Sequence, residues 1–141
     1  MVGIEQYFRN LFLSHQILVD YLNREKGPSI PNDQSDIFID SLPGFSDGFS
    51  KHLPLILIKC IECRDSFFYD DEPHAYDVVL NIRIGARTYE ELSVIGELLT
   101  NQMLEESFIL TDSDSFNDSV ENMRGLSITL RNNVFMGLHR N

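Results

Sequence analysis

The chain has 141 residues, a length typical of one domain, and 43% of them are hydrophobic, which supplies a core between two structural layers. Its formal net charge of -11 argues against general nucleic-acid binding, because a protein that neutralises phosphates needs a basic face. The chain starts without the basic segment of a signal peptide and has no apolar run of membrane-spanning length, so we expect one cytosolic domain over residues 1–141, outside the membrane.

The first predicted element is a helix from Ile4 to Arg24. Its apolar residues recur at helical spacing and form a wide stripe: Ile4, Tyr7, Phe8, Leu11, Phe12, Ile17, Leu18, Tyr21 and Leu22. The run Lys26-Gly27-Pro28 is a typical helix stop. Residues 28–34 then form a polar connector, Asp36–Asp40 a short edge strand, and residues 42–49 a turn-rich segment.

Two long strands follow. Residues Leu55–Cys63 are apolar on both faces at their start, which predicts a central strand that is covered on both sides there. Residues Tyr76–Ile84 alternate between apolar and polar positions, as in a strand with one buried face. We expect the acidic segment from Arg64 to His74 to be a flexible hairpin loop.

A helix is predicted from Tyr89 to about Glu106. Thr88 and Glu91 have the spacing of a capping box, in which each side chain bonds the other residue's backbone amide. Gly96 indicates a close approach to a strand. The predicted buried stripe consists of Leu92, Ile95, Leu99 and Met103, widened by Leu98 and Leu104.

The last third of the chain contains further short strands. We expect a strand at Ser107–Leu110, a mobile polar loop from Thr111 to Gly125, and a strand at Leu126–Arg131. Residues Val134–Leu138 continue that strand after a bulge at Asn132–Asn133. This order predicts an α+β two-layer sandwich, a mixed or antiparallel sheet of about four to five strands packed by two helices.

Candidate chemistry is weak. Cys60 and Cys63 match a CxxC pattern, but in a strand their side chains point to opposite faces, and no second cysteine pair completes a zinc site. The acidic residues between Arg64 and His74 lack the spacing and glycine of a calcium loop, so we expect a solvated tip, and Asp112, Asp114 and Asp118 are interpreted in the same way.

The four histidines are also unlike a catalytic set, since no two are four residues apart on a helix and no Gly-x-Ser-x-Gly elbow exists. They are His15, His52, His74 and His139. No glycine-rich phosphate loop precedes a helix, and carboxylates near Lys59, such as Glu62 and Asp77, have no nuclease-like spacing. We therefore predict no catalytic, cofactor-binding or metal-binding residues, and a protein that is not an enzyme.

Five arginines, namely Arg83, Arg87, Arg124, Arg131 and Arg140, are spread over the C-terminal elements. They either lie on solvated edges or pair with acidic loops across a subunit boundary, which gives register and specificity. The candidate interface residues are Asp36, Phe38, Asp70, Asp71, Glu72, Arg83, Arg87 and Arg131.

Four segments together resemble a known family: residues 38–43 (FIDSLP), residues 54–58 (PLILI), residues 78–85 (VVLNIRIG) and the helix at 91–104. Their arrangement is similar to that of small tail-completion proteins of long-tailed bacteriophages, in particular the tail terminator group and its minor-tail relatives. The resemblance extends from Asp36 to the last predicted strand and consists of strand and helix patterns, so it carries over no binding residue.

The resemblance implies a ring-forming α+β protein, typically a hexamer, that binds the end of the tail tube, stops its elongation and offers a surface to the head–tail connector. Its partners would be its own copies, the tube protein and the connector, and DNA would pass through an acidic lumen without specific binding. The protein would belong to the virion tail after assembly in the host cytoplasm, with no cofactor.

Three alternatives stay open. The chain could instead be a head–tail connector or stopper, which is also a compact α+β protein that forms rings. A small metal-dependent or hydrolytic enzyme could use the acidic hairpin and a histidine. A regulator could bind one protein partner through the helix from Ile4 to Leu22. In a ring, the edge strand Asp36–Asp40 can pair with or abut a neighbouring subunit.

Overall fold

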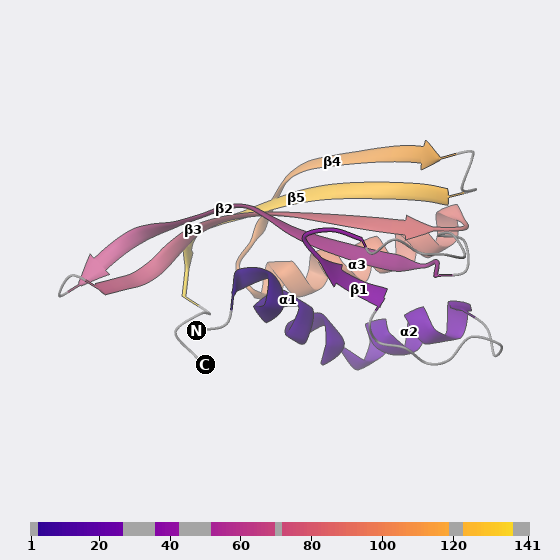
Figure 1. Ribbon diagram of the computed structural model, residues 1–141, viewed down its shortest axis with the longest axis horizontal. Helices are drawn as coiled ribbons and strands as arrows, with labels where there is room; N and C mark the ends of the chain where they lie inside the picture. The colour runs from indigo at the N-terminus through magenta and orange to yellow at the C-terminus, as the bar shows by residue number, and fades with distance from the viewer. Residues whose placement is uncertain (1–2, 27–35, 43–51, 70–71, 119–122, 137–141) are drawn as a thin grey trace.

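The computed structural model describes residues 3–26, 36–42, 52–69, 72–118 and 123–136. These contain α1 (Ile4–Leu13), α2 (Gln16–Lys26), β1 (Ile37–Ile39), β2 (Leu55–Tyr69), β3 (Glu72–Ala86), α3 (Tyr89–Glu105), β4 (Ile109–Asp118) and β5 (Met123–Phe135). The fold is α+β, with three helices packed against one five-stranded mixed sheet (Figure 1). The predicted fold class is confirmed.

The strands lie in the order β1-β2-β3-β5-β4. Only β1 and β2 are parallel, and the other neighbours pair antiparallel, so the sheet is mixed. β1 and β4 are the two edges. The β2–β3 hairpin reaches past the end of α1, so one end of the sheet projects beyond the helical layer (Figure 1).

One face of the sheet is buried under the helices. Alternate residues of the central strands supply it, as the strand period of two requires; they include Ile56, Ile58, Leu80, Ile82, Ile84, Ile128 and Leu130. Phe8 of α1 forms edge-to-face or tilted ring contacts with Tyr7, Phe108 and Phe135, at centroid distances of 5.0 to 5.4 Å. This aromatic cluster joins α1 to the start of β4 and the end of β5.

The expected single N-terminal helix is wrong, because α1 ends at Leu13 and α2 begins at Gln16. The Ser14 hydroxyl donates back to the Leu11 carbonyl over 2.7 Å, and His15 Nδ1 accepts from the Leu18 amide over 3.3 Å. Both side chains therefore satisfy backbone groups that a continuous helix would pair internally. The break turns Ile17 to solvent, with 67% of its surface exposed.

The expected loop from Arg64 to His74 is also wrong in its described part. β2 continues to Tyr69 and β3 begins at Glu72, while residues 70–71 lie outside the described residues. The pairing contains register shifts between Cys60 and Glu62 and again after Asp65. Such bulges disturb the side-chain alternation on which the prediction depended.

The expected loop from Thr111 to Gly125 is wrong as well, because β4 pairs with β5 along its whole length. The short strand predicted at Ser107–Leu110 is the beginning of this longer one. Residues 109–117 are all exposed, so β4 has no buried face and shows no apolar alternation in the sequence. Leu104, predicted in the buried stripe of α3, is 52% exposed.

Three predictions for the second half of the chain are confirmed, but the strand predicted to continue to Leu138 ends at Phe135, and residues 137–138 lie outside the described residues. Thr88 and Glu91 form a complete capping box at the start of α3. Gly96 lets α3 approach β5, since an added Cβ would lie 3.0 Å from Leu126 Cδ2. β5 runs through Asn132–Asn133 with a register shift opposite Tyr76 to Val78, which is the predicted bulge.

Some predicted segments cannot be compared. The connector at 28–34 and residues 43–49 of the turn-rich segment lie outside the described residues. Within the described part of the chain, no helix is both long and apolar enough to span a membrane.

Candidate functional site

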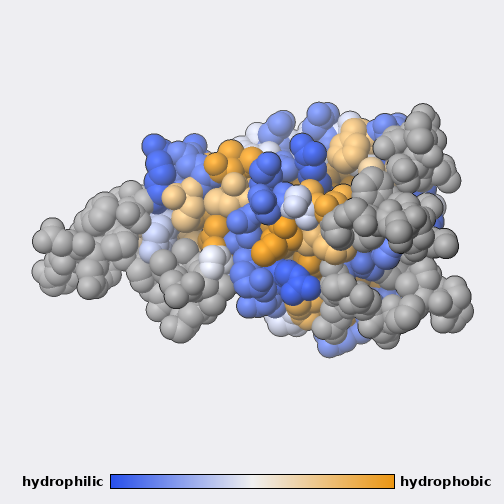
Figure 2. Space-filling view, in the orientation of Figure 1, coloured by the Kyte–Doolittle hydropathy of each residue, from blue (hydrophilic) through white to orange (hydrophobic). Residues whose placement is uncertain are grey.

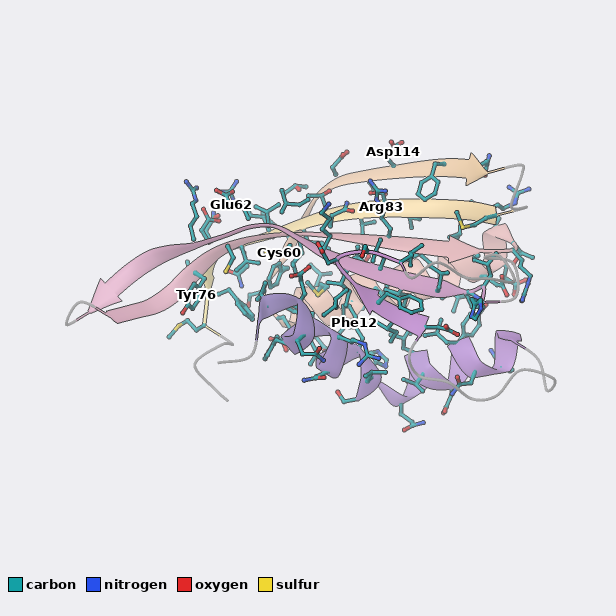
Figure 3. All side chains as sticks on the ribbon, in the orientation of Figure 1. Phe12, Cys60, Glu62, Tyr76, Arg83 and Asp114 are labelled. Carbon is teal, nitrogen blue, oxygen red and sulfur yellow. The ribbon has the colours of Figure 1, made fainter. Side chains whose placement is uncertain are left out.

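The sheet face opposite the helices carries a row of mostly polar side chains. The paired residues Phe38, Leu57, Arg83, Ser127 and Asp114 run across all five strands in one register. Figure 3 shows Glu62, Arg83 and Asp114 on this side of the ribbon, with Phe12, Cys60 and Tyr76 on the helical side. We call the surface that contains this row the open face.

An ion network lies on the open face at the root of the β2–β3 hairpin. Asp77 Oδ2 accepts from Arg131 Nη2 at 2.8 Å and from Arg64 Nη2 at 3.3 Å. Arg64 Nε also contacts Glu62 Oε1 at 2.5 Å. The hydrogen bond from Arg131 is the main cause that lowers the pKa of Asp77. The network therefore joins β2, β3 and β5 where the hairpin leaves the body.

The candidate arginines have different surroundings. Arg131 is paired with Asp77 within the chain, so its charge stabilises the fold of the chain itself. Arg83 is exposed, and its Nε donates to Asn81 Oδ1 at 3.3 Å. The backbone amide of Arg87 donates to Glu91 Oε1 at 2.9 Å, which places Arg87 at the capping box of α3.

Asp36 and Phe38 lie at the β1 edge. Asp36 is only 5% exposed, and its Oδ1 lies 3.7 Å from His52 Nδ1, so little of its surface can contact a partner. Phe38 is partly buried on the open face, opposite Leu57. Of the other candidates, Asp70 and Asp71 lie outside the described residues, and Glu72 is the first residue of β3.

The outward carbonyls of the β1 edge accept hydrogen bonds from within the chain. The Asp40 amide donates to the Ile58 carbonyl of β2, so the backbone groups of Asp40 point toward β2. Backbone direction alternates along a strand, and the backbone groups of Ile37 and Ile39 therefore point away from β2. The Ile37 carbonyl accepts from Arg9 Nε at 2.7 Å. The Ile39 carbonyl accepts from the Ser41 amide at 2.8 Å. Both outward carbonyls therefore already have a donor within the chain, which disfavours pairing with a neighbouring strand.

The β4 edge is different, because no described residue covers it. Every residue from 109 to 117 is exposed, including Leu110 at 46% and Phe116 at 38%. Beside it, a groove of about 700 Å³ runs between α3 and the strands β4 and β5. Its lining includes Ser93 and Glu97 of α3, Ser113 and Ser115 of β4, and Leu126 and Ile128 of β5.

The prediction for the two cysteines is wrong in its geometry. Because the bulge adds Ile61, Cys60 pairs with Leu80 and Cys63 with Val78, and both partners point to the helical face. Cys60 and Cys63 are therefore on the same face, although they form no disulfide. Burial is the main cause that raises the pKa of Cys60 to about 11, which disfavours its thiolate.

Two histidines have structural contacts: His15 caps α2 and His52 faces Asp36. Among the residues that the structure describes, no group of three or more His, Cys, Asp and Glu side chains could hold a metal ion. His139 and the tip of the acidic hairpin lie outside that part of the chain.

The sequence predicted an edge strand at Asp36–Asp40, and β1 is an edge of the sheet, but sequence reasoning missed the difference between the two edges. Arg9 lies within the predicted helix but outside its apolar stripe, and only the fold brings it to Ile37. The signal for β4 was the alternation Asp112-Ser113-Asp114-Ser115, which has the strand period but no apolar residue to mark it.

Over the described molecule, hydrophobic and hydrophilic side chains form interleaved patches on the face drawn in Figure 2.

Comparison of the chain with protein-family models gives no match. Comparison with curated proteins gives no significant match.

Proposed function

We propose that this chain is a structural assembly protein that acts as a phage tail terminator. It forms a ring on the end of the tail tube, stops elongation and offers the opposite surface to the head–tail connector. The resemblance of residues 38–43, 54–58, 78–85 and 91–104 to that family supports the proposal. The observation that carries it furthest is the projecting β2–β3 hairpin (Figure 1).

The hairpin is suited to contact a neighbour. Each of its strands has 15 residues, which corresponds to about 50 Å at the usual rise per residue. A two-stranded ribbon outside the body is marginally stable alone and gains stability when it packs on another surface. The Arg64–Asp77–Arg131 network fixes its root, so the outer part acts as a directed arm toward the next subunit or the tube.

The charge of the chain is compatible with a ring around DNA. A net charge of -11 repels phosphates, so DNA would pass through a lumen without being held. A head–tail connector or stopper would have the same ring and the same negative charge. The two functions differ in the partner that the ring binds, the tail tube for a terminator and the connector alone for a stopper. The regulator alternative has less support, because Phe8, Phe12 and Leu18 of the N-terminal stripe are fully buried within the chain.

Two measurements test the proposal. Native mass spectrometry of the purified chain should show a closed ring, either free or after addition of tail-tube protein. Electron microscopy of tube protein polymerised with the chain should show tails of limited length, capped at one end. The hairpin variant Asp70→Lys with Asp71→Lys should lose the ring and length control.

The matched control is Asp20→Lys with Glu105→Lys, which changes the charge equally at exposed positions of α2 and α3. This control should keep both properties. If the chain stays monomeric with the tube protein present and tail lengths do not change, the proposal is wrong. A ring that binds the connector and ignores the tube would instead establish the stopper function.

A further inference from the structure

The open edge of the sheet is built to accept another strand. β4 has ten residues, and within the described part of the chain it pairs with β5 on one side only. In an antiparallel ladder alternate residues direct their backbone groups away from the partner, so about half of β4 presents unpaired donors and acceptors. The segment contains no proline and no lysine, two residues that commonly protect an edge.

The groove beside β4 has a shape that fits such an added strand. Side chains of a strand alternate between the two faces, so every second side chain of an added strand would point to the α3 side. Four β4 residues line the groove, and two of them, Ser113 and Ser115, are small and leave the way to Leu126 and Ile128 open, while Leu110 and Asn117 lie on either side of them. Large apolar side chains of the added strand would therefore enter the groove, next to α3.

The other side chains of the added strand would lie on the open face, next to carboxylates of β4. Asp112 pairs with Thr129 and Asp114 with Ser127, which places both aspartates on the open face. Among the described residues neither has an ion-pair partner, and residues 109–118 contain no basic residue. A lysine or arginine opposite each aspartate would form a favourable cross-strand pair.

The same charges disfavour a second copy of the chain. An antiparallel β4–β4 pair would bring the aspartates of two copies together, and like charges on facing strands are destabilising. Pairing with the β1 edge of another copy is also disfavoured, because Arg9 and Ser41 already donate to its outward carbonyls. The charge of this edge therefore favours a basic segment of a different protein over either described sheet edge of a second copy.

We propose that β4 and the groove beside α3 bind an extended basic segment of a partner protein as a sixth strand. Its basic residues lie on the open face against Asp112 and Asp114, and its apolar residues enter the groove. Main-chain hydrogen bonds give affinity and the alternating side chains give specificity, as in other strand-addition complexes. The proposal does not depend on ring formation or on a phage partner.

The test uses the full chain and a labelled eight-residue peptide of alternating lysine and valine. Fluorescence anisotropy should show saturable binding, and hydrogen exchange should show slower exchange of β4 amides in the complex. The double variant Asp112→Lys with Asp114→Lys should weaken binding about tenfold or more, since two attractive pairs become repulsive. The control Asp20→Lys with Glu105→Lys has the same net charge and should bind like the unchanged chain.

Two further peptides separate strand addition from simple charge attraction. A peptide in which proline replaces each valine keeps the charge but loses half of its backbone donors, and it should not bind. A peptide of alternating glutamate and valine should not bind either. Equal binding of either peptide, protection away from β4, or no binding of the lysine–valine peptide would overturn the proposal. Protection of β4 by dimerisation without peptide would overturn it too.

Discussion

Arg9 on α1 donates from Nε to the carbonyl oxygen of Ile37 on β1 over 2.7 Å. This bond connects the helical layer to the outermost backbone group of an edge strand. Together with the Ser41 amide on Ile39, it gives both outward carbonyls of β1 a donor within the chain, which disfavours intermolecular pairing there. The two edges of the sheet are therefore unequal, and β4 is the more open one.

Replacing Arg9 should test how much this contact stabilises the fold. We expect Arg9→Ala to lower the free energy of unfolding by about 1–3 kcal/mol, because a charged donor is lost and a carbonyl is left unpaired. Urea denaturation measures the change. The control is Arg24→Ala, which removes an exposed guanidinium 5.0 Å from the Tyr21 ring centroid and should cost about 0.5–1 kcal/mol. Equal losses in both variants would contradict a special role for Arg9.

The parts of the fold that the sequence predicted well have strong local signals. The alternation from Tyr76 to Ile84 marks a half-buried strand, and the Thr88–Glu91 spacing marks the start of α3. The sheet, its approximate strand number and the helical cover follow from those elements. Gly96 was also informative, because close approach of α3 to β5 requires a small residue there.

The parts that were wrong depend on interactions outside the local pattern. β4 has no buried face, so only its pairing with β5 makes it a strand. The bulge at Ile61 moves Cys63 to the face of Cys60, and no local rule places a bulge there. The break after Leu13 arises from side-chain bonds of Ser14 and His15 that helical periodicity does not register. The difference between the β1 and β4 edges could not be predicted for the same reason, because it also depends on interactions outside the local pattern.

Phe116 and Gly125 form a cross-strand pair on the open face that should be energetically coupled. A Cβ at Gly125 would overlap the Phe116 ring, which covers this glycine. We expect Gly125→Ala to destabilise the fold by about 1–3 kcal/mol, because the ring must move. In the double variant with Phe116→Ala, the loss should be smaller than the sum of the single losses. Strict additivity in urea denaturation would show that the two residues do not interact.

The capping box should stabilise α3 measurably. We expect Thr88→Ala to cost about 1 kcal/mol, since the Glu91 amide loses its acceptor at 3.1 Å. Glu91→Ala should cost about 1–3 kcal/mol, because its buried carboxylate accepts from the amides of Arg87 and Thr88. Denaturation of both variants should be compared with Glu90→Ala, an exposed residue in the same turn. A loss in Glu90→Ala as large as that in Glu91→Ala would contradict the assignment.

The network at the hairpin root should make stability depend on pH in the acid range. The hydrogen bond from Arg131 lowers the pKa of Asp77 below its ordinary value of 3.8. The unfolded chain then binds a proton at Asp77 more readily than the folded chain does. The stability that ionised Asp77 adds is therefore complete above the pKa of Asp77 in the unfolded chain, and it disappears as pH falls through the pKa of Asp77 in the folded chain. Asp77→Asn should therefore be less stable than the unchanged chain at pH 7, and this difference should shrink on acidification.

The measurement for Asp77 is urea denaturation at several pH values between about 2 and 7, the range that brackets carboxylate titration. Asp114→Asn is the matched control, because Asp114 is exposed and has no ion-pair partner among the described residues. This variant shows the effect of removing a carboxylate outside the network. A difference between Asp77→Asn and the unchanged chain that does not vary with pH would show that the pairing with Arg131 contributes nothing specific.

The two cysteines should react at different rates although they share a face. Burial raises the pKa of Cys60 to about 11, so about one thiol in a thousand is ionised at pH 8, and the thiolate is the reactive form. Iodoacetamide should therefore alkylate the exposed Cys63 first. In Cys63→Ser, native alkylation should be slow and should accelerate strongly in urea, whereas Cys60→Ser should react quickly in both conditions. Mass spectrometry gives the rates, and equally fast native alkylation of both variants would show that Cys60 is not held in a buried environment.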